Sequence, residues 1–257
     1  MSKTIALLSA ALVCLLHDSM VSIRAQETPS HPDFTGVYYP FNPNAAARGR
    51  AAGPPGAAAP PRPVAVIDGR DGRPATAPKL TTEYLAKWEV LRKSRMAGSS
   101  ATDPNANCLS AGMPSMMGMG YGMEIQHTKD KITIYGELND VYRRIFLDGR
   151  KPSQRMLDDP TFAGYSTGHW EGDTLAVDTV AVRDDTLLDL FSPHSDQMTV
   201  GERIRFTSPG TLEDRVTTTD PKALLEPFVQ VRTYRKASPP NDELREFSCA
   251  EGLASAK

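Results

Sequence analysis

From Gly122 onward the chain consists of short segments in which apolar and polar residues alternate, with turn residues between them. Alternation with a period of two is typical of strands that bury one face. The connectors, such as 129–130 and 208–210, have the length of hairpin turns. The strands predicted in this way span 123–128, 131–138, 141–147, 165–170, 174–182, 199–207, 211–219, 228–235 and 243–249, and a short earlier strand is predicted within 31–40.

About eight or nine consecutive strands joined mostly by hairpins predict an antiparallel meander. Such a sheet removes its exposed edges most simply by closing on itself. We therefore expect a mainly β chain that forms a barrel of about eight strands. A sandwich of two sheets is the alternative.

One helix is expected before the strands. Tyr84, Trp88 and Leu91 recur at helical spacing within 80–98, basic residues fill the last turn, and Gly98 follows it. An aromatic stripe of this kind is typical of a buried helix face. We expect this N-terminal helix to pack on the barrel.

The first residues have the pattern of a secretory signal: a short cationic start, an apolar run too short to span a membrane, and a small residue near the end. We expect a signal peptide over 1–25, with cleavage near Ala25, and a periplasmic or secreted mature protein. Residues 26–79 are expected to hold the first strand and an Ala/Pro/Gly-rich arm. Residues 80–257 are expected to hold the helix and the barrel.

Two cysteines, Cys108 and Cys249, remain after the signal is removed. In an oxidising compartment such a pair is more typical of a disulfide than of a metal site, and two free thiols are the alternative.

The charge is nearly balanced, with 29 basic and 31 acidic residues, which does not favour a nucleic-acid partner. No nucleotide, flavin or phosphate-loop motif is present, so we expect no organic cofactor.

The pentapeptide at 164–168 matches the G-x-S-x-G pattern of serine hydrolases, with Ser166 at its centre. That motif requires a strand that turns sharply into a helix. Here the residues that follow predict a hairpin turn at 171–173 and another strand. The pattern therefore does not predict a nucleophile.

Four ionisable residues fall on strand faces that alternation leaves otherwise apolar or aromatic: His127, Arg143, His169 and Glu202. Buried ionisable groups are costly and collect at functional sites. Taken together they predict an acid/base set, in which His127 or His169 is the general base, Glu202 orients it or acts as the acid, and Arg143 stabilises negative charge. The alternatives are a structural ion pair between Arg143 and Glu202, or faces turned to solvent. The expected substrate contacts are Tyr121, Met123, Tyr135 and Tyr165.

Methionines and glycines dominate the segment 113–123. Clustered thioethers can bind Cu(I) in an exported protein. The other interpretation is a pliable apolar plug, or the lining of a pocket. Because no histidine-rich segment accompanies the methionines, we assign no metal site.

The hairpin segment "GHWEGDTLAVDTV" at 168–180 carries a resemblance, together with "YRRIFLDGR", "GERIRF", "TTTDPKA" and "EFSCAE". These residues resemble a family of exported bacterial proteins that share a Gly-His/Arg-Trp-Glu-Gly-Asp-Thr-Leu-Val-Val-Asp/Glu-Thr hairpin. The resemblance covers about 108–249; Ala176 replaces the usual Val, and Ala181-Val182 replaces the usual Gly-Phe. It implies export and a β fold, and no particular reaction.

These observations combine into a calycin/lipocalin-like barrel that holds a small apolar or aromatic molecule. Our first hypothesis is an exported enzyme that works without an organic cofactor by acid/base chemistry, as a lyase, isomerase or cyclase. The alternative is a non-catalytic periplasmic protein that binds a hydrophobic ligand or a metal. Histidines that face an interior pocket favour the enzyme, and outward histidines with an apolar pocket favour binding. An envelope assembly protein is a third hypothesis.

Overall fold

The computed structural model describes residues 31–42, 67–68, 73–74, 76–101, 103–189, 191–239, 243–247 and 249. The chain divides into two units, 1–30 and 31–257, and the described residues all belong to the second. The expected signal peptide and most of the expected arm lie outside the described residues.

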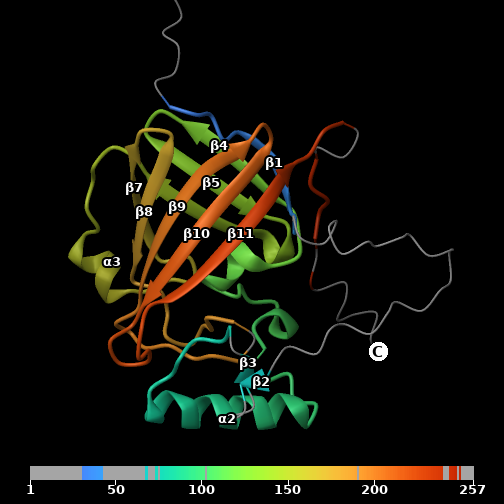
Figure 1. Ribbon diagram of the computed structural model, residues 1–257, viewed down its shortest axis with the longest axis vertical. Coiled ribbons are helices and arrows are strands. Elements are labelled where there is room, and N and C mark those ends of the chain that lie inside the picture. Colours follow the sequence, from blue (N-terminus) through green and yellow to red (C-terminus); the bar gives the residue numbers. More distant parts are fainter. Residues whose placement is uncertain are drawn as a thin grey trace, which may run out of the picture. The chain divides into compact units, whose positions relative to one another are not determined.

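Strands of the second unit form one closed barrel (Figure 1). They are β1 (Gly36–Pro40), β4 (Met123–Thr128), β5 (Lys131–Gly136), β6 (Val141–Phe146), β7 (Tyr165–Glu171), β8 (Thr174–Val180), β9 (Thr199–Ser208), β10 (Thr211–Thr219) and β11 (Phe228–Lys236). Their order around the barrel is β1-β11-β10-β9-β8-β7-β6-β5-β4, and β1 pairs with β4 to close it. The predicted mainly β barrel is confirmed, and the sandwich alternative is wrong.

One pair of neighbours departs from the expected meander. β6 and β7 are parallel, paired at Ile145 with Ser166 and at Phe146 with Thr167, whereas the other barrel pairs are antiparallel. A hairpin cannot join parallel strands. The chain instead crosses over through 147–164, which contains the short helix α3 (Gln154–Asp158).

The last predicted strand, at 243–249, is wrong, because residues 243–247 are not in a strand. Its expected place next to β11 is taken by β1, which pairs Tyr39 with Arg235. Residues 80–257 therefore do not hold the whole barrel, since β1 precedes the arm and completes the ring.

The predicted helix is present as α2 (Thr82–Met96), with Tyr84 and Trp88 buried. It packs on loops at the base of the barrel, meaning the end at which β4 begins, and not on the face of the sheet (Figure 1). The backbone N–H of Thr81 donates to Ala223 O at 2.9 Å, and Leu80 forms a bridge with Leu224. The remaining short elements are β2 (Ile67–Asp68), β3 (Arg73–Pro74), η1 (Asn105–Asn107), η2 (Ser115–Gly118) and η3 (Leu138–Asp140).

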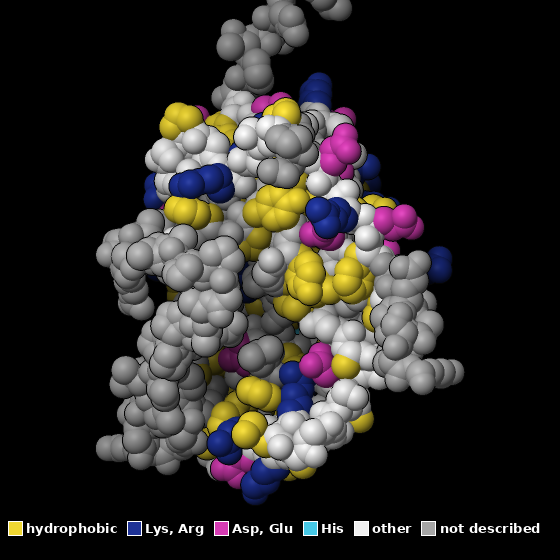
Figure 2. Space-filling model, turned by 90° about the vertical axis from the view of Figure 1, so that its right-hand side faces the viewer, with side chains coloured by type: hydrophobic (Ala, Val, Ile, Leu, Met, Phe, Trp, Pro, Cys, Tyr) yellow, Lys and Arg dark blue, Asp and Glu magenta, His cyan; other side chains and the backbone are white. Residues whose placement is uncertain are grey.

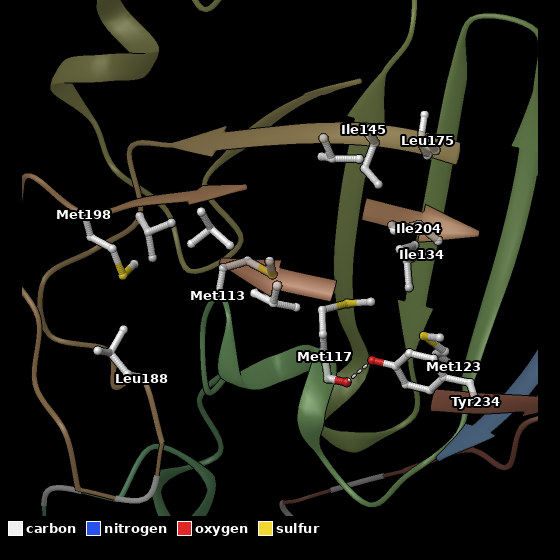
Figure 3. Close-up of a cluster of buried hydrophobic side chains, with 14 of the residues drawn as sticks. Met113, Met117, Met123, Ile134, Ile145, Leu175, Leu188, Met198, Ile204 and Tyr234 are labelled. Carbon is white, nitrogen blue, oxygen red and sulfur yellow. Dashed lines mark hydrogen bonds between the residues drawn. The ribbon is translucent and has the colours of Figure 1, made fainter. Parts of the chain in front are cut away.

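The core fills the interior of the barrel (Figure 3). Alternate residues on each strand point inward, so that Ile125 pairs with Ile134, and Leu175 pairs with Ile204. Each such side chain stabilises the fold by about 1.5–3 kcal/mol through burial.

The side of the barrel that carries β1 and β11 shows hydrophobic and charged side chains side by side (Figure 2), and Val231 on the outer face of β11 is exposed. Among the described residues, no helix has both the length and the apolar character needed to cross a membrane.

Candidate functional site

The methionine-rich segment 113–123 closes the base of the barrel. Met113 and Met117 are buried in the core, which they share with strand residues (Figure 3). Two side chains of β11 hold the backbone of this segment: Tyr234 donates its hydroxyl to Met117 O at 2.5 Å, and Arg232 donates Nη1–H to Pro114 O at 2.7 Å. We call residues 113–123 the methionine plug. Of the two interpretations from the sequence, this placement favours the apolar plug.

The local sequence explains how the plug enters the barrel. Gly112 has φ +73°, and a Cβ at this position would lie 2.5 Å from Cγ2 of Thr186, so the chain can turn inward here only with glycine. Methionine is unbranched and flexible, which allows it to fill the irregular space between converging strands. The plug is thus a tight turn followed by adaptable apolar side chains.

A small cavity of about 30 Å³ lies between the plug and strands β4, β5 and β11. We call it the base cavity. Its lining is mainly apolar and consists of Asn105, Ala111, Met116, Met117, Met119, Tyr121, Gly122, Met123, Ile134, Gly136, Glu137, Leu138, Val141 and Tyr234. The carboxylate of Glu137 accepts hydrogen bonds from the backbone N–H groups of Gly122 and Arg245, at 3.2 and 3.3 Å. With that carboxylate engaged, the cavity offers chiefly thioether, aliphatic and aromatic surface.

Deeper in the barrel, Arg143 and Glu202 form an ion pair with both side chains completely buried. Arg143 Nη1 donates to Glu202 Oε1 at 2.8 Å, and the guanidinium also donates to the hydroxyls of Ser166 and Thr179 at 3.1–3.3 Å. Burial alone would lower the pKa of Arg143, but the charge and hydrogen bonds of Glu202 raise it. The arginine is thus charged and fully engaged.

Asp214 on β10 lies beside this ion pair and is 1% exposed. Burial, and then the negative charge of Glu202, raise the pKa of Asp214 well above its ordinary value of 3.8, against the charges of Arg232 and Arg143. Burial therefore favours the neutral, protonated form of its side chain. In this form it shares a hydrogen bond with the carboxylate of Glu202, which also raises its pKa, and no N–H or O–H group of the described residues donates to either of its oxygens.

The opposite end of the barrel is closed by aromatic side chains. Phe34 is buried against Trp170 and Phe206, with ring centroids 5.4 and 5.2 Å apart, and His31 stacks on Trp170 at 4.7 Å. His127 lies here, with its ring centroid 5.8 Å from that of Trp170. Burial lowers the pKa of His127, although Asp33 opposes this effect.

The structure brings together only part of the predicted acid/base set. Arg143 and Glu202 are in direct contact, but they form the structural ion pair that was the alternative. His127 faces inward, but it lies at the aromatic end and does not line the base cavity.

His169 does not face the interior, which is contrary to its predicted place on the inner face. Its side chain is 62% exposed and lies 3.1 Å from Glu171, which is itself exposed. The reason is the orientation of β7: Ser166, Gly168 and Trp170 point inward, and the face with His169 points outward.

The predicted substrate contacts are divided in the same way. Tyr121 and Met123 line the base cavity. Tyr135 and Tyr165 face the exterior: Tyr135 donates to Asp140, which raises its pKa to about 12, and Tyr165 is covered by Phe146, with ring centroids 5.2 Å apart.

Two other predictions concern the disulfide and Ser166. The disulfide between Cys108 and Cys249 is present, across a sequence separation of 141. The hydroxyl of Ser166 lies 2.8 Å from that of Thr179 inside the barrel and accepts hydrogen bonds from Arg143; the strand that contains it continues through a hairpin into β8, as expected, and not into a helix. Among the described residues, no group of three or more His, Cys, Asp or Glu side chains could hold a metal ion.

Sequence reasoning missed Asp214, Arg232 and Tyr234. Asp214 follows the same pattern as the residues that were singled out, since it alternates with Leu212 and Val216 on one face of its strand. The same rule of alternation could have found it. Arg232 and Tyr234 gave no such signal, because their importance depends on contacts with a loop more than 110 residues away in the sequence.

No family model matches the chain, and no curated protein matches it. Among solved structures it is similar to the crystal structure of the wild-type fluorescent protein UnaG, with 19% identity and a TM-score of 0.28 over 45% of this chain and 72% of that chain. A UnaG variant in which one asparagine is replaced by alanine gives 18% identity and a TM-score of 0.30, over 52% and 86% of the two chains. TM-scores this low support no conclusion about this chain, whose barrel is established by its own strand pairing.

Proposed function

We propose that this protein binds a small hydrophobic molecule at the base of its barrel, and that the methionine plug moves to admit it. The observation that carries the proposal is the closure of the base. It is sealed by an inserted loop of flexible methionines, with an apolar cavity beneath it, and not by the side chains of the strands alone. Ligand sites are commonly apolar, and methionine surfaces adapt to what they bind.

The arrangement of ionisable groups supports binding over catalysis. An acid/base enzyme needs its base within hydrogen-bond reach of the reacting atoms. His169 is on the exterior, His127 is at the aromatic end, and Glu202 is occupied by Arg143. The base cavity is lined by none of these three.

The size of the cavity sets the energetic condition for binding. At about 30 Å³ it does not accommodate an aromatic molecule while Met117 is in place. A ligand must therefore displace buried methionine, and its own burial has to offset that loss. Apparent affinity then depends on how readily the plug opens, since a competent state that is rarely populated weakens binding in proportion.

Naphthalene titrated into the purified full-length protein tests this proposal, with bound ligand read from its fluorescence. Native mass spectrometry of the protein as purified reports any molecule or metal that it retains. Met117→Ala removes the side chain that fills the base, and we expect naphthalene to bind about tenfold more tightly to this variant, because the plug then competes less. Met156→Ala changes an exposed methionine away from the base cavity and should leave binding unchanged. Absence of binding to both wild type and Met117→Ala contradicts the proposal.

We further propose that the protein acts outside the cytoplasm, as a member of the exported family that its hairpin motif resembles. The disulfide between Cys108 and Cys249 supports this, because such bonds persist in oxidising compartments. Immunoblotting of fractionated cells tests it: protein found only in the cytoplasmic fraction contradicts the proposal.

A further inference from the structure

A second, inner cavity lies inside the barrel beyond the base cavity. It measures about 10 Å³ and is enclosed mainly by aliphatic and aromatic side chains. Asp214 is the one charged or acidic residue among its lining residues. The other residues that line it are Phe34, Met117, Met123, Ile125, Ile132, Ile134, Ile145, Leu175, Ile204, Leu212 and Tyr234.

The inner cavity and the base cavity adjoin. Met117, Met123, Ile134 and Tyr234 line both of them. Of these four, Met117 and Met123 belong to the plug, and Met117 comes from its inserted loop. A molecule that displaces Met117 therefore extends from the base cavity to Asp214.

Part of the hydrogen-bonding capacity of Asp214 is unused. Its acid proton is engaged by Glu202, but no N–H or O–H group of the described residues donates to either of its oxygens, although the residue is 1% exposed. A protonated carboxyl group has one donor and further acceptor capacity. A buried polar group of this kind costs about 1–3 kcal/mol when it is left without a partner, which favours any molecule that supplies one.

The neighbouring charges decide what kind of group fits. Two arginines act on Asp214 with their charges, but neither lines the inner cavity: Arg143 is bound to Glu202, Ser166 and Thr179, and Arg232 is bound to Pro114 O and Gln230. Glu202 adds a negative charge next to Asp214. A carboxylate brought here would be desolvated beside another carboxylate, which is strongly unfavourable.

We propose that Asp214 is the polar anchor of the ligand site, and that it selects neutral hydrophobic molecules with a hydroxyl group at the leading end. The inference rests on the proposed function and adds a ligand class to it. A cavity of about 10–15 Å³ holds one water molecule, and a hydroxyl takes the place of a water because it donates and accepts at one atom. It matches Asp214 whether the acid proton points to the ligand or toward Glu202.

Three rigid probes of one shape test the inference: naphthalene, 2-naphthol and 2-naphthoate, each titrated into the full-length protein near pH 7. We expect 2-naphthol to bind about tenfold more tightly than naphthalene, which corresponds to one net hydrogen bond. We expect 2-naphthoate to bind more weakly than either. Asp214→Leu should make naphthol and naphthalene equal, whereas Asp214→Asn, which keeps a donor and an acceptor, should retain the preference.

Thr218→Val is the matched control. Thr218 is also a buried residue of β10 whose hydroxyl oxygen has no hydrogen-bond partner among the described residues, but it lines neither cavity. This variant should keep the preference of the wild type for naphthol. Thermal unfolding followed by circular dichroism checks that all three variants are folded.

The outcomes separate the two proposals. If naphthalene binds and Asp214→Leu still prefers naphthol tenfold, the inference is wrong and the proposed function stands; the hydroxyl of Tyr234 would then be the anchor to examine. Tighter binding of 2-naphthoate than of 2-naphthol also overturns it. If no probe binds to wild type or to Met117→Ala, the proposed function fails and this inference fails with it.

Discussion

Arg143 on β6 and Glu202 on β9 form a bidentate ion pair inside the barrel, and both side chains are 0% exposed. Removing one partner of such a pair leaves an uncompensated buried charge. We expect Glu202→Gln to lower the free energy of unfolding by about 3–5 kcal/mol, measured by equilibrium unfolding in urea. Glu171→Gln is the control, because it breaks the exposed pair with Arg203, and it should change the midpoint little.

Asp214 should reduce the loss of stability caused by Glu202→Gln. In the wild type, the charge of Glu202 helps to keep Asp214 protonated. Once Glu202 is neutral, Asp214 can ionise and compensate Arg143 in part. We therefore expect Glu202→Gln combined with Asp214→Asn to be less stable than the sum of the two single effects, by at least about 0.5 kcal/mol in a double-mutant cycle. Additive effects contradict the coupling.

The disulfide joins Cys249 to Cys108, which directly follows η1, next to the segment that leads into the plug. Because it closes a loop with a separation of 141 residues, the chain-entropy model assigns it about 5 kcal/mol. We expect the double variant Cys108→Ser/Cys249→Ser to lose stability of that order in urea. Wild type in the presence of reductant should match the double variant, and unchanged midpoints in both cases contradict the prediction.

His194 should lower the stability of the fold in mild acid. His194 is buried, with Nε2 2.8 Å from Oγ1 of Thr186 and Nδ1 2.9 Å from Ser195 O. Burial lowers its pKa below the ordinary 6.5, although the hydrogen bond to Ser195 and nearby carboxylates oppose this. The unfolded chain thus binds a proton that the folded chain does not. The stabilisation is present above pH 6.5 and is lost as the pH falls through the folded pKa.

His127 adds to this loss in the same direction, since burial also lowers its pKa. Asp214 acts in the opposite direction: its raised pKa gives stability that is present in acid and is lost as the pH rises through the folded value. Between pH 7 and pH 5 the two histidines therefore lower the free energy of unfolding, and Asp214 raises it. We expect His194→Gln to remove the histidine's share, so that the free energy of unfolding of the variant falls less on acidification than that of the wild type, by up to about 1.4 kcal/mol per pH unit. Equal slopes for the two proteins in urea unfolding contradict the prediction.

The strands of the barrel were predictable because the alternation is strong wherever one face is plainly apolar, as in β4 and β9. β7 has no such face, since Ser166 and Gly168 alternate with Tyr165 and Thr167. Its orientation is decided by tertiary crowding: a Cβ at Gly168 would lie 3.0 Å from side-chain atoms of Ile145 and of Leu147, so only a small residue fits inside. No local pattern reports that contact, and the prediction for His169 failed for this reason.

The parallel pairing of β6 and β7 could not be predicted from the sequence either. It depends on the path of 147–164, which has little regular structure beyond the five residues of α3. The methionine plug was one of two interpretations of segment 113–123, because flexible thioether side chains can fill an irregular apolar space as well as bind Cu(I). Its anchoring by Arg232 and Tyr234 could not be predicted, because β11 meets the plug only in the closed barrel.

Two adjacent residues of β7 test the orientation of that strand directly. Trp170 packs inward against Phe34, and His169 points outward. We expect Trp170→Ala to lower the free energy of unfolding by about 3 kcal/mol, because it opens a cavity at the aromatic end of the barrel. His169→Ala should change it by no more than about 0.5 kcal/mol.

The same pair separates binding from the acid/base hypothesis. His169→Ala should leave naphthalene affinity within about twofold of wild type, because this side chain lines neither the base cavity nor the inner cavity. Urea unfolding and naphthalene titration of both variants supply the measurements. A large loss of stability or of binding in His169→Ala would indicate that His169 faces the interior of the barrel, and it would again be a candidate general base.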